Sequence, residues 1–319
     1  MGRIETVANT CDKIGNYMRT NECKRIKLID NVVPDGLENK AVLGGACTIE
    51  DNGLCLIDVG GNITIYCGNE DVYKDESNLP KIFSRISAVE VDLSSLSGKK
   101  DIIIPSTFEY SHIGTAKMPD FSSTTSCYIA RMFHSSTVDD VTIRGIKDYR
   151  RRQQGPLDDL FAGCNAGSVR MQNINMNKCN IFRTFYNSTI DQLSIEESVI
   201  GSKERVYIDS MFDWATIDKL RIEKCNINVK ELHSFGFCDI KEVNIKDSTF
   251  SINLIGSDTY KIGKIVLSNV KIMLNELNWV LQSCNVDEVV SDDPRAENIV
   301  DEIEKSLKRR IKCTIEQRQ

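Results

Sequence analysis

The side chains of this chain that could carry out acid–base chemistry are few and lie far apart in the sequence. His112, His134 and His233 stand alone, and none lies in a His-x-x-Glu-His zinc motif or beside a nucleophile elbow. The carboxylate pairs Asp139-Asp140 and Asp158-Asp159 flank predicted starts of strands or helical turns, where solvated acids are ordinary. We therefore expect no catalytic site and a protein that is not an enzyme.

Cofactor and metal ligands also lack a recognisable spacing. No Gly-x-x-x-x-Gly-Lys or Gly-x-Gly-x-x-Gly phosphate loop occurs, and Gly44-Gly45 and Gly60-Gly61 are typical of turns. The sequence has 12 cysteines and 3 histidines but no Cys-x-x-Cys pair, which a zinc site commonly uses. We expect neither a cofactor nor a bound metal.

Charge and cysteine content limit the classes of partner. The chain has 46 acidic and 40 basic residues, a net charge of -6, which argues against a general binder of nucleic acid or of anionic membranes. Its first residues contain no apolar run typical of a signal peptide or a membrane span. Cysteines at core or turn positions of the repeat described below are interpreted as buried, reduced thiols. The cysteines at these positions are Cys164, Cys225, Cys238 and Cys284. Together these features predict a cytoplasmic protein without a membrane partner.

The elements that must position any functional side chain follow a repeated spacing. An anchor residue, usually phenylalanine, is followed by apolar residues five, eight and ten positions later. The anchors recur at intervals of roughly 22 to 28 residues, within the range of solenoid repeats. Among all the followers only Ser291 is not apolar. The anchors are Phe83, Phe108, Phe133, Phe161, Phe185, Phe212, Phe235, Ser257 and Leu281.

Each repeat predicts a short strand and a helical turn. Apolar and polar residues alternate from Leu220 to Ile222, which is the period of a strand with one buried face. Ile208 and Phe212 lie four positions apart, one helical turn on the same face. Because one such unit cannot bury its apolar side alone, neighbouring repeats must close the core. The sequence therefore predicts one elongated solenoid.

The unit Ile217-x-x-Leu220-x-Ile222-x-x-Cys225-x-Ile227 resembles the leucine-rich repeat consensus, in which the Cys position caps the turn that leaves the strand. Met132-Phe133, Leu160-Phe161-Ala162-Gly163-Cys164 and Met211-Phe212 resemble the Met-Phe-x-x-Cys signature of the BspA-like repeats of bacterial surface proteins. The chain looks like a divergent relative of that family over roughly residues 79–291. The resemblance implies an α/β solenoid, a leucine-rich-repeat-like stack of short parallel strands and helical turns. It also implies adhesion to host or matrix proteins.

The two ends of the chain predict helical caps. Apolar residues from Ile4 to Met18 share one helix face, and an Asn52-Gly53 turn predicts a hairpin. Asp293-Pro294 is a helix start, followed by an apolar stripe that reaches Ile311. We interpret this last helix as a cap, with a dimerisation helix as the alternative. The predicted parts are an N-terminal capping helix and first strand at 1–40, a β-hairpin region that continues the repeat frame at 41–78, the solenoid at 79–292 and the C-terminal capping helix at 293–319.

Polar residues between the apolar strand positions must point outward, and stacked repeats align them in columns across a parallel sheet. The central predicted column is Asp92, Lys117, Thr142, Arg170, Ser194, Arg221, Asn244, Val266 and Val290. Two interpretations are open: a solvated face, in which each ion pair contributes only about a few tenths of a kcal/mol, or the place where a partner binds. The candidate binding residues on this face are Lys117, Arg144, Arg170, Lys219, Arg221 and Glu223.

A second candidate site is the insertion at residues 147–156, which lengthens the interval after Phe133. The insertion contains a basic run, Arg150, Arg151 and Arg152, directly after Tyr149. Gly155-Pro156 ends the insertion. Tyrosine and arginine are enriched in binding hot spots, and insertions in solenoids project as loops. A solvated loop is the alternative reading.

We favour a non-enzymatic repeat scaffold that binds another macromolecule, preferably a protein, through the sheet face and the 147–156 loop. The absence of an export signal and the cysteine content favour a bacterial or phage inhibitor or immunity-type protein that acts inside the cell. Three alternatives remain open at this stage: a surface adhesin-like protein, a nucleic-acid-binding inhibitor that uses the arginines, and a self-assembling structural protein that pairs through its C-terminal helix.

Overall fold

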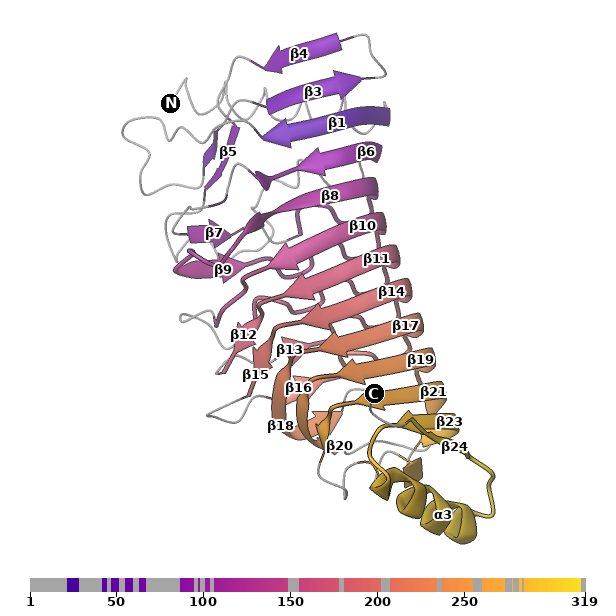
Figure 1. The fold of residues 1–319 in the computed structure, drawn as a ribbon. Coiled ribbons are helices and arrows are strands. Elements are labelled where there is room, and N and C mark those ends of the chain that lie inside the picture. The colour runs from indigo at the N-terminus through magenta and orange to yellow at the C-terminus, as the bar shows by residue number, and fades with distance from the viewer. Residues whose placement is uncertain are drawn as a thin grey trace.

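The computed structural model of the chain is a parallel β-solenoid in which successive turns add neighbouring strands to one long sheet (Figure 1). That sheet has 13 strands, and its order from the C-terminal edge is β24-β23-β21-β19-β17-β14-β11-β10-β8-β6-β1-β3-β4. The structure describes residues 22–28, 42–44, 47–51, 55–59, 63–66, 87–94, 97, 101–103, 106–148, 155–177, 181–201, 207–233, 237–254, 260–272, 277, 281, 282 and 284–316.

The repeated strands of the long sheet are parallel, and most are eight or nine residues long. Their bounds are β6 (Ser87–Asp92), β8 (His112–Asp120), β10 (Thr137–Arg144), β11 (Asn165–Gln172), β14 (Thr189–Glu196), β17 (Thr216–Glu223), β19 (Asp239–Lys246), β21 (Tyr260–Ser268) and β23 (Cys284–Ser291). They are thus longer than the short strand that the sequence predicts.

The apolar followers of each anchor point into the core, as the repeat spacing predicts. In β14 the side chains of Ile190, Leu193 and Ile195 are buried, whereas Asp191 and Gln192 between them both face solvent. The register repeats from strand to strand: Leu193 lies opposite Val169 of β11 and opposite Leu220 of β17. Because side chains at equivalent positions stack in this way, each turn of the solenoid closes the core of the next.

The side of the solenoid behind the long sheet is built from strands, which corrects the expectation of helical turns there. The chain turns after β14, β17 and β19 at Ser198, Cys225 and Ser248, whose side chains bond to backbone groups at the corner. Val, Ile and Phe then favour an extended chain. The second parallel sheet contains β12 (Asn175–Met176), β13 (Ile181–Phe182), β15 (Val199–Ile200), β16 (Tyr207–Asp209), β18 (Asn226–His233), β20 (Thr249–Leu254) and β22 (Lys271–Ile272).

The segments that carry the described phenylalanine anchors are tight turns, not α-helical turns, whereas the anchor Leu281 lies in a helical segment, as the sequence predicts. In the turn around Phe133, Arg131 and Ser135 adopt left-handed conformations with φ of 59° and 55°, which a helix does not allow. The backbone N–H of Phe133 donates to the carbonyl oxygen of Leu160 in the next turn of the solenoid, at 2.9 Å. A spacing of four residues therefore marks two inward positions of a turn, whose backbone hydrogen bonds run both within the turn and to the next turn of the solenoid.

The anchor rings form a continuous stack through the core. Five of them lie in succession with near-parallel planes, and their ring centroids are separated by 5.7, 5.2, 5.5 and 5.5 Å. Each of these rings is at most 4% exposed, so the stack fills the space beside the long sheet. Its members are Phe108, Phe133, Phe161, Phe185 and Phe212, while the anchors Phe83, Phe235 and Ser257 lie outside the described residues.

The N-terminal part contributes further strands. β1 (Glu22–Leu28) pairs parallel with β6, and the predicted hairpin is present as β3 (Cys47–Asp51) and β4 (Cys55–Val59), which extend the long sheet antiparallel. β2 (Val42–Gly44) and β5 (Ile63–Tyr66) form a separate antiparallel pair, so Ile63 and Ile65 do not continue the parallel frame. β7 (Asp101–Ile103) pairs with β9 (Ser126–Tyr128). The predicted capping helix at residues 4–18 lies outside the described residues.

The C-terminal end carries the helix α3 (Arg295–Leu307), which lies beside β23 and β24 in Figure 1. Pro294 has helical dihedral angles, and the Asp293 carboxylate accepts a hydrogen bond from the N–H of Arg295 at 2.9 Å. The apolar residues Ala296, Ile299, Val300 and Ile303 are buried in the core. The prediction that the helical stripe reaches Ile311 is wrong, because Lys308 is left-handed (φ 53°) and β24 (Lys312–Ile315) then pairs parallel with β23.

Candidate functional site

The outer face of the long sheet carries rows of polar side chains in register. The predicted column is present as a row of registered neighbours: Lys117 lies opposite both Asp92 and Thr142, and Arg221 lies opposite both Ser194 and Asn244. We call it the central row, made of Asp92, Lys117, Thr142, Arg170, Ser194, Arg221, Asn244, Val266 and Val290. Its two end members, Asp92 and Val290, are buried and do not face solvent as predicted. Neighbouring strands lie about 4.8 Å apart.

Two further rows flank the central row. One, two positions earlier in each strand, is Glu90, Thr115, Asp140, Ser168, Gln192, Lys219, Glu242, Lys264, Glu288 and Lys312. The other, two positions later, is Arg144, Gln172, Glu196, Glu223 and Lys246. The three rows bring together all the strand residues predicted to bind a partner.

Several of these predicted residues hold one another in place. Arg144 donates from Nε and Nη2 to Gln172 Oε1 at 3.1 and 2.6 Å, and the Gln172 amide donates to Glu196 Oε2 at 2.7 Å. Arg170 lies 3.6 Å from Glu196, and Arg221 is paired with Glu223. These contacts join β10, β11 and β14 across the face, and the Arg221–Glu223 pair lies within β17, so these side chains are ordered before any partner arrives.

Glu196 occupies the centre of this network. Partial burial works to raise the pKa of Glu196, but the hydrogen bond from Gln172 and the positive charges of Arg170 and Arg221 outweigh it and lower the pKa. The carboxylate is therefore charged at neutral pH and neutralises part of the charge of the arginines. Arg170 and Arg221 still expose 52% and 53% of their side chains, which leaves both accessible to a partner.

Charges of opposite sign alternate along the earlier row near the C-terminal end. Lys219, Glu242, Lys264, Glu288 and Lys312 follow one another on successive strands. Glu288 lies 2.6 Å from Lys312 and 3.8 Å from Lys264. Exposed pairs of this kind contribute little to stability, whereas their pattern fixes where opposite charges of a partner would have to lie.

The insertion presents only its two ends in the described structure, because Tyr149, Arg150, Arg151 and Arg152 lie outside the described residues. On one side the Asp148 carboxylate accepts the N–H of Asn177 at 2.9 Å. On the other side the N–H of Gly155 donates to Asp158 at 2.9 Å. Both ends of the loop are thus fastened to the solenoid.

Asp158 is buried, which corrects the expectation of a solvated acid at this position. Its side chain is 9% exposed and also accepts the N–H of Phe182 at 3.1 Å. Burial raises the pKa of Asp158 to about 7, against the opposing effect of the two backbone hydrogen bonds. Since both carboxylate oxygens bond backbone groups next to the loop, we assign Asp158 a structural role at its base.

The three histidines lie on separate elements: His112 begins β8, His134 lies in the turn before β10, and His233 ends β18. His134 Nδ1 lies 3.1 Å from Ser135 Oγ, and burial lowers the pKa of this histidine. Asp139 and Asp140 are exposed on β10. Among the described residues no group of His, Cys, Asp and Glu has the arrangement of a metal site.

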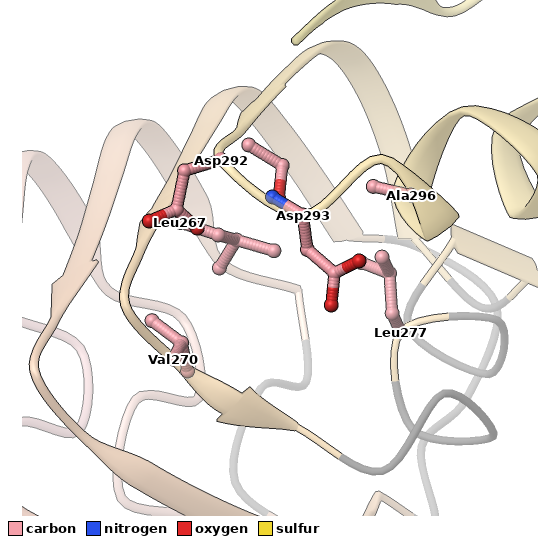
Figure 2. A pocket seen from close by; sticks show the side chains of 7 residues that line it. Leu267, Val270, Leu277, Asp292, Asp293 and Ala296 are labelled. Carbon is pink, nitrogen blue, oxygen red and sulfur yellow. The ribbon is translucent and has the colours of Figure 1, made fainter. Parts of the chain in front are cut away.

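A small cavity lies where β21, β23 and the start of α3 meet (Figure 2). Its volume is ≈ 20 Å³, enough for about one water molecule. Side chains of both polar and apolar residues line it, and Figure 2 shows Asp293 and Leu277 on one side. A cavity of this size fits no organic substrate. The lining residues are Leu267, Val270, Leu277, Ser291, Asp292, Asp293 and Ala296.

Exposed aromatic residues in the turns were missed by the sequence patterns. Trp214 and Phe237 are 55% and 51% exposed, and their rings stack with centroids 4.5 Å apart. Both stand two positions after an anchor, where neighbouring repeats have Asn187 and Gly163. The sequence signal for these exposed aromatic residues was the contrast between large rings and small residues at one position of the repeat.

No protein-family model, curated protein or solved structure matches the chain. Within the described part of the chain, no helix combines the length and apolar character needed to span a membrane.

Proposed function

We propose that this chain is a non-enzymatic scaffold that binds another protein through the outer face of its long sheet. The observation that carries the proposal is the registered array of exposed charges on β8 to β21, centred on Arg170 and Arg221. A solenoid needs these outward side chains only to be soluble. Arginine, however, combines a fixed fork of donors with a planar apolar face and is enriched at binding hot spots.

Pre-ordering of the face supports this function. Because Arg144, Gln172 and Glu196 are already joined by hydrogen bonds, binding would immobilise few additional side chains, and less conformational entropy would be lost. Mixed signs on adjacent strands favour one orientation of a protein partner. A nucleic acid would instead meet the carboxylates of Glu196, Glu223 and Glu242 between the basic groups. These carboxylates repel phosphates.

The proposal includes the 147–156 loop as a second contact. Its two ends are held by Asp148 and Asp158, and its sequence offers Tyr149 and three arginines. A role inside the cell, as an inhibitor or immunity-type protein, belongs to the same proposal and is supported by the buried thiols Cys164, Cys225 and Cys284. A relationship to BspA-like repeats is supported by the buried Phe and Cys of the repeat signature.

Self-association through the C-terminal helix is not part of the proposal. The apolar residues Ala296, Ile299, Val300 and Ile303 of α3 are buried against the solenoid core. Only Leu307 among the large apolar residues of this helix is notably exposed, at 43%. The helix therefore offers a second copy little apolar surface, whereas it covers the end of the core well.

The decisive experiment compares partner capture by three forms of the chain in extracts of its native cell. Arg170→Glu with Arg221→Glu reverses two charges of the central row, and we expect it to weaken capture of the partner at least tenfold. Lys305→Glu, on the exposed side of α3, is the matched charge-reversal control and should capture normally. Nuclease treatment of the extract should leave capture unchanged.

Equal capture by the sheet variant and the control would refute the sheet face as the binding site. Loss of capture after nuclease treatment would identify a nucleic acid as the partner and refute a protein one. Thermal unfolding of all three forms is required alongside, and since the substituted residues are about half exposed, we expect changes within about 1 kcal/mol.

A further inference from the structure

One backbone position recurs in the six turns that precede β8, β10, β11, β14, β17 and β19. The residue two places after the anchor adopts a left-handed conformation with φ between 52° and 66°. The repeat of this geometry shows that the turn itself requires it. The residues at this position are Tyr110, Ser135, Gly163, Asn187, Trp214 and Phe237.

Aromatic residues are poorly suited to this position. Glycine and asparagine adopt the left-handed conformation at low cost, whereas a bulky residue there is strained. Trp214 (φ 62°) and Phe237 (φ 55°) nevertheless occupy it in consecutive turns, and each leaves more than half of its surface in solvent. Neither backbone preference nor burial in the core accounts for a pair of large rings here, and sites of local strain are often functional.

The two rings form a single exposed surface. Their centroids are 4.5 Å apart and their planes differ by 21°. Such stacking offsets part of the backbone strain but leaves the outer parts of both rings accessible. We call Trp214 and Phe237 together the aromatic pair. It lies at the start of β17 and β19, on the border of the charged outer face.

Two acidic residues lie beside the aromatic pair in the sequence. Asp213 precedes Trp214, and Asp239 follows Phe237 by two residues. Both carboxylates act on Cys238, whose pKa is raised to about 12 by burial, by Cys284 and by these acids. Of the nearby lysines, Lys241 is bound to Asp218 at 2.6 Å, and Lys261 lies opposite Asp239 in the sheet register. An aromatic surface among carboxylates selects for a cationic group.

We propose that Trp214 and Phe237 form a docking site for an arginine side chain of a partner protein. A guanidinium group is planar and weakly hydrated, so it stacks on aromatic faces and bonds carboxylates at the same time. Asp213 and Asp239 supply the carboxylates. This inference rests on the proposed function for the identity of the partner as a protein, and it adds the chemical group that the partner must present.

The test uses fluorescein-labelled ten-residue peptides in which glycine alternates with arginine, lysine or glutamate, titrated with the full chain and followed by fluorescence anisotropy. We expect the arginine peptide to bind at least threefold more tightly than the lysine peptide and at least tenfold more tightly than the glutamate peptide. Trp214→Asn with Phe237→Asn should weaken binding of the arginine peptide at least tenfold. Trp214→Phe, which keeps an aromatic face, should stay within threefold of the unmodified chain.

Equal affinity for arginine and lysine peptides, unchanged binding by the double variant, or no binding of the arginine peptide would each overturn the inference. Asparagine suits the left-handed backbone, so the double variant should unfold at a temperature no lower than that of the parent chain. If it does not fold, Asp213→Asn with Asp239→Asn gives the second measurement, with at least threefold weaker binding expected and unchanged binding counting against the site.

The same peptides separate this inference from the function proposed for the sheet. Arg170→Glu with Arg221→Glu should not weaken binding of the arginine peptide, because it leaves the aromatic pair intact. Partner capture that depends on the sheet arginines but not on the aromatic pair would refute the arginine site alone. Peptide binding that depends on the aromatic pair, together with partner capture insensitive to the sheet arginines, would refute the sheet face alone.

Discussion

At the scale of single residues, Asp158 couples the base of the inserted loop to pH. Burial raises its pKa from 3.8 to about 7, so the folded state holds a proton that the unfolded chain releases between these values. The stabilisation from this group is complete below about pH 4 and is lost as pH rises through 7. Each pKa unit corresponds to about 1.4 kcal/mol.

Asp158→Asn should therefore flatten the fall in stability between pH 4 and pH 7. The amide keeps an oxygen that can accept from Gly155 or Phe182, and it cannot ionise. Relative to the parent chain the variant should gain stability at pH 8 compared with pH 4, as measured by urea unfolding at both values. Asp191→Asn, on the exposed surface of β14, is the control. The assignment is contradicted if the free energy of unfolding of the parent chain rises from pH 4 to pH 7 and the variant shows the same rise.

At the scale of elements, three of the long strands carry a glycine where the backbone of the preceding strand comes close. At Gly167 in β11 a Cβ atom would lie 2.6 Å from the carbonyl oxygen of Asp139 in the preceding strand. Gly114 and Gly263 meet the same restriction at the equivalent place in β8 and β21. Since backbone forms the obstacle, no side-chain movement relieves it.

Gly167→Ala should destabilise the protein by about 1–3 kcal/mol, as expected for overpacking against a fixed backbone. Asp191→Ala is the matched control, because Asp191 occupies the same repeat position in β14 and already has a Cβ atom. We expect the control to change stability by less than about 0.5 kcal/mol. Chemical denaturation of both variants is the measurement, and equal stability would show that the strands move apart at little cost.

The elements also show which parts of the fold were predictable. Inward positions such as Ile190 and Leu193 were identified because a hydrophobic period and a repeat agree with each other. The turn around Phe133 was misread as helical because two inward positions four residues apart fit both a helix and a turn, and only the φ angles of Arg131 and Ser135 distinguish them. The end of α3 at Leu307 was not predictable either, because a single left-handed residue such as Lys308 does not change the hydrophobic pattern.

At the scale of the whole molecule, the outer surface could be predicted only in part. The central row followed from the inward positions, because successive strand residues point to opposite faces. Trp214 could not be assigned in the same way, since aromatic residues are usually core residues and the core was already filled by the Phe stack. Its exposure depends on the path of the turn and not on its own hydrophobicity.

Because the register between β11, β14, β17 and β19 is uniform, whole turns of the solenoid could be removed without changing the others. Thr189 and Thr216 are equivalent positions, so deletion of residues 190–216 should join two turns without shifting any remaining inward residue. The shortened chain should fold cooperatively and be about 4.8 Å shorter by small-angle X-ray scattering, one strand spacing. A collapsed or unfolded product would mean that the turns are not interchangeable. If they are, the length of the solenoid can be changed by whole turns, each about one strand spacing, while its two ends stay the same.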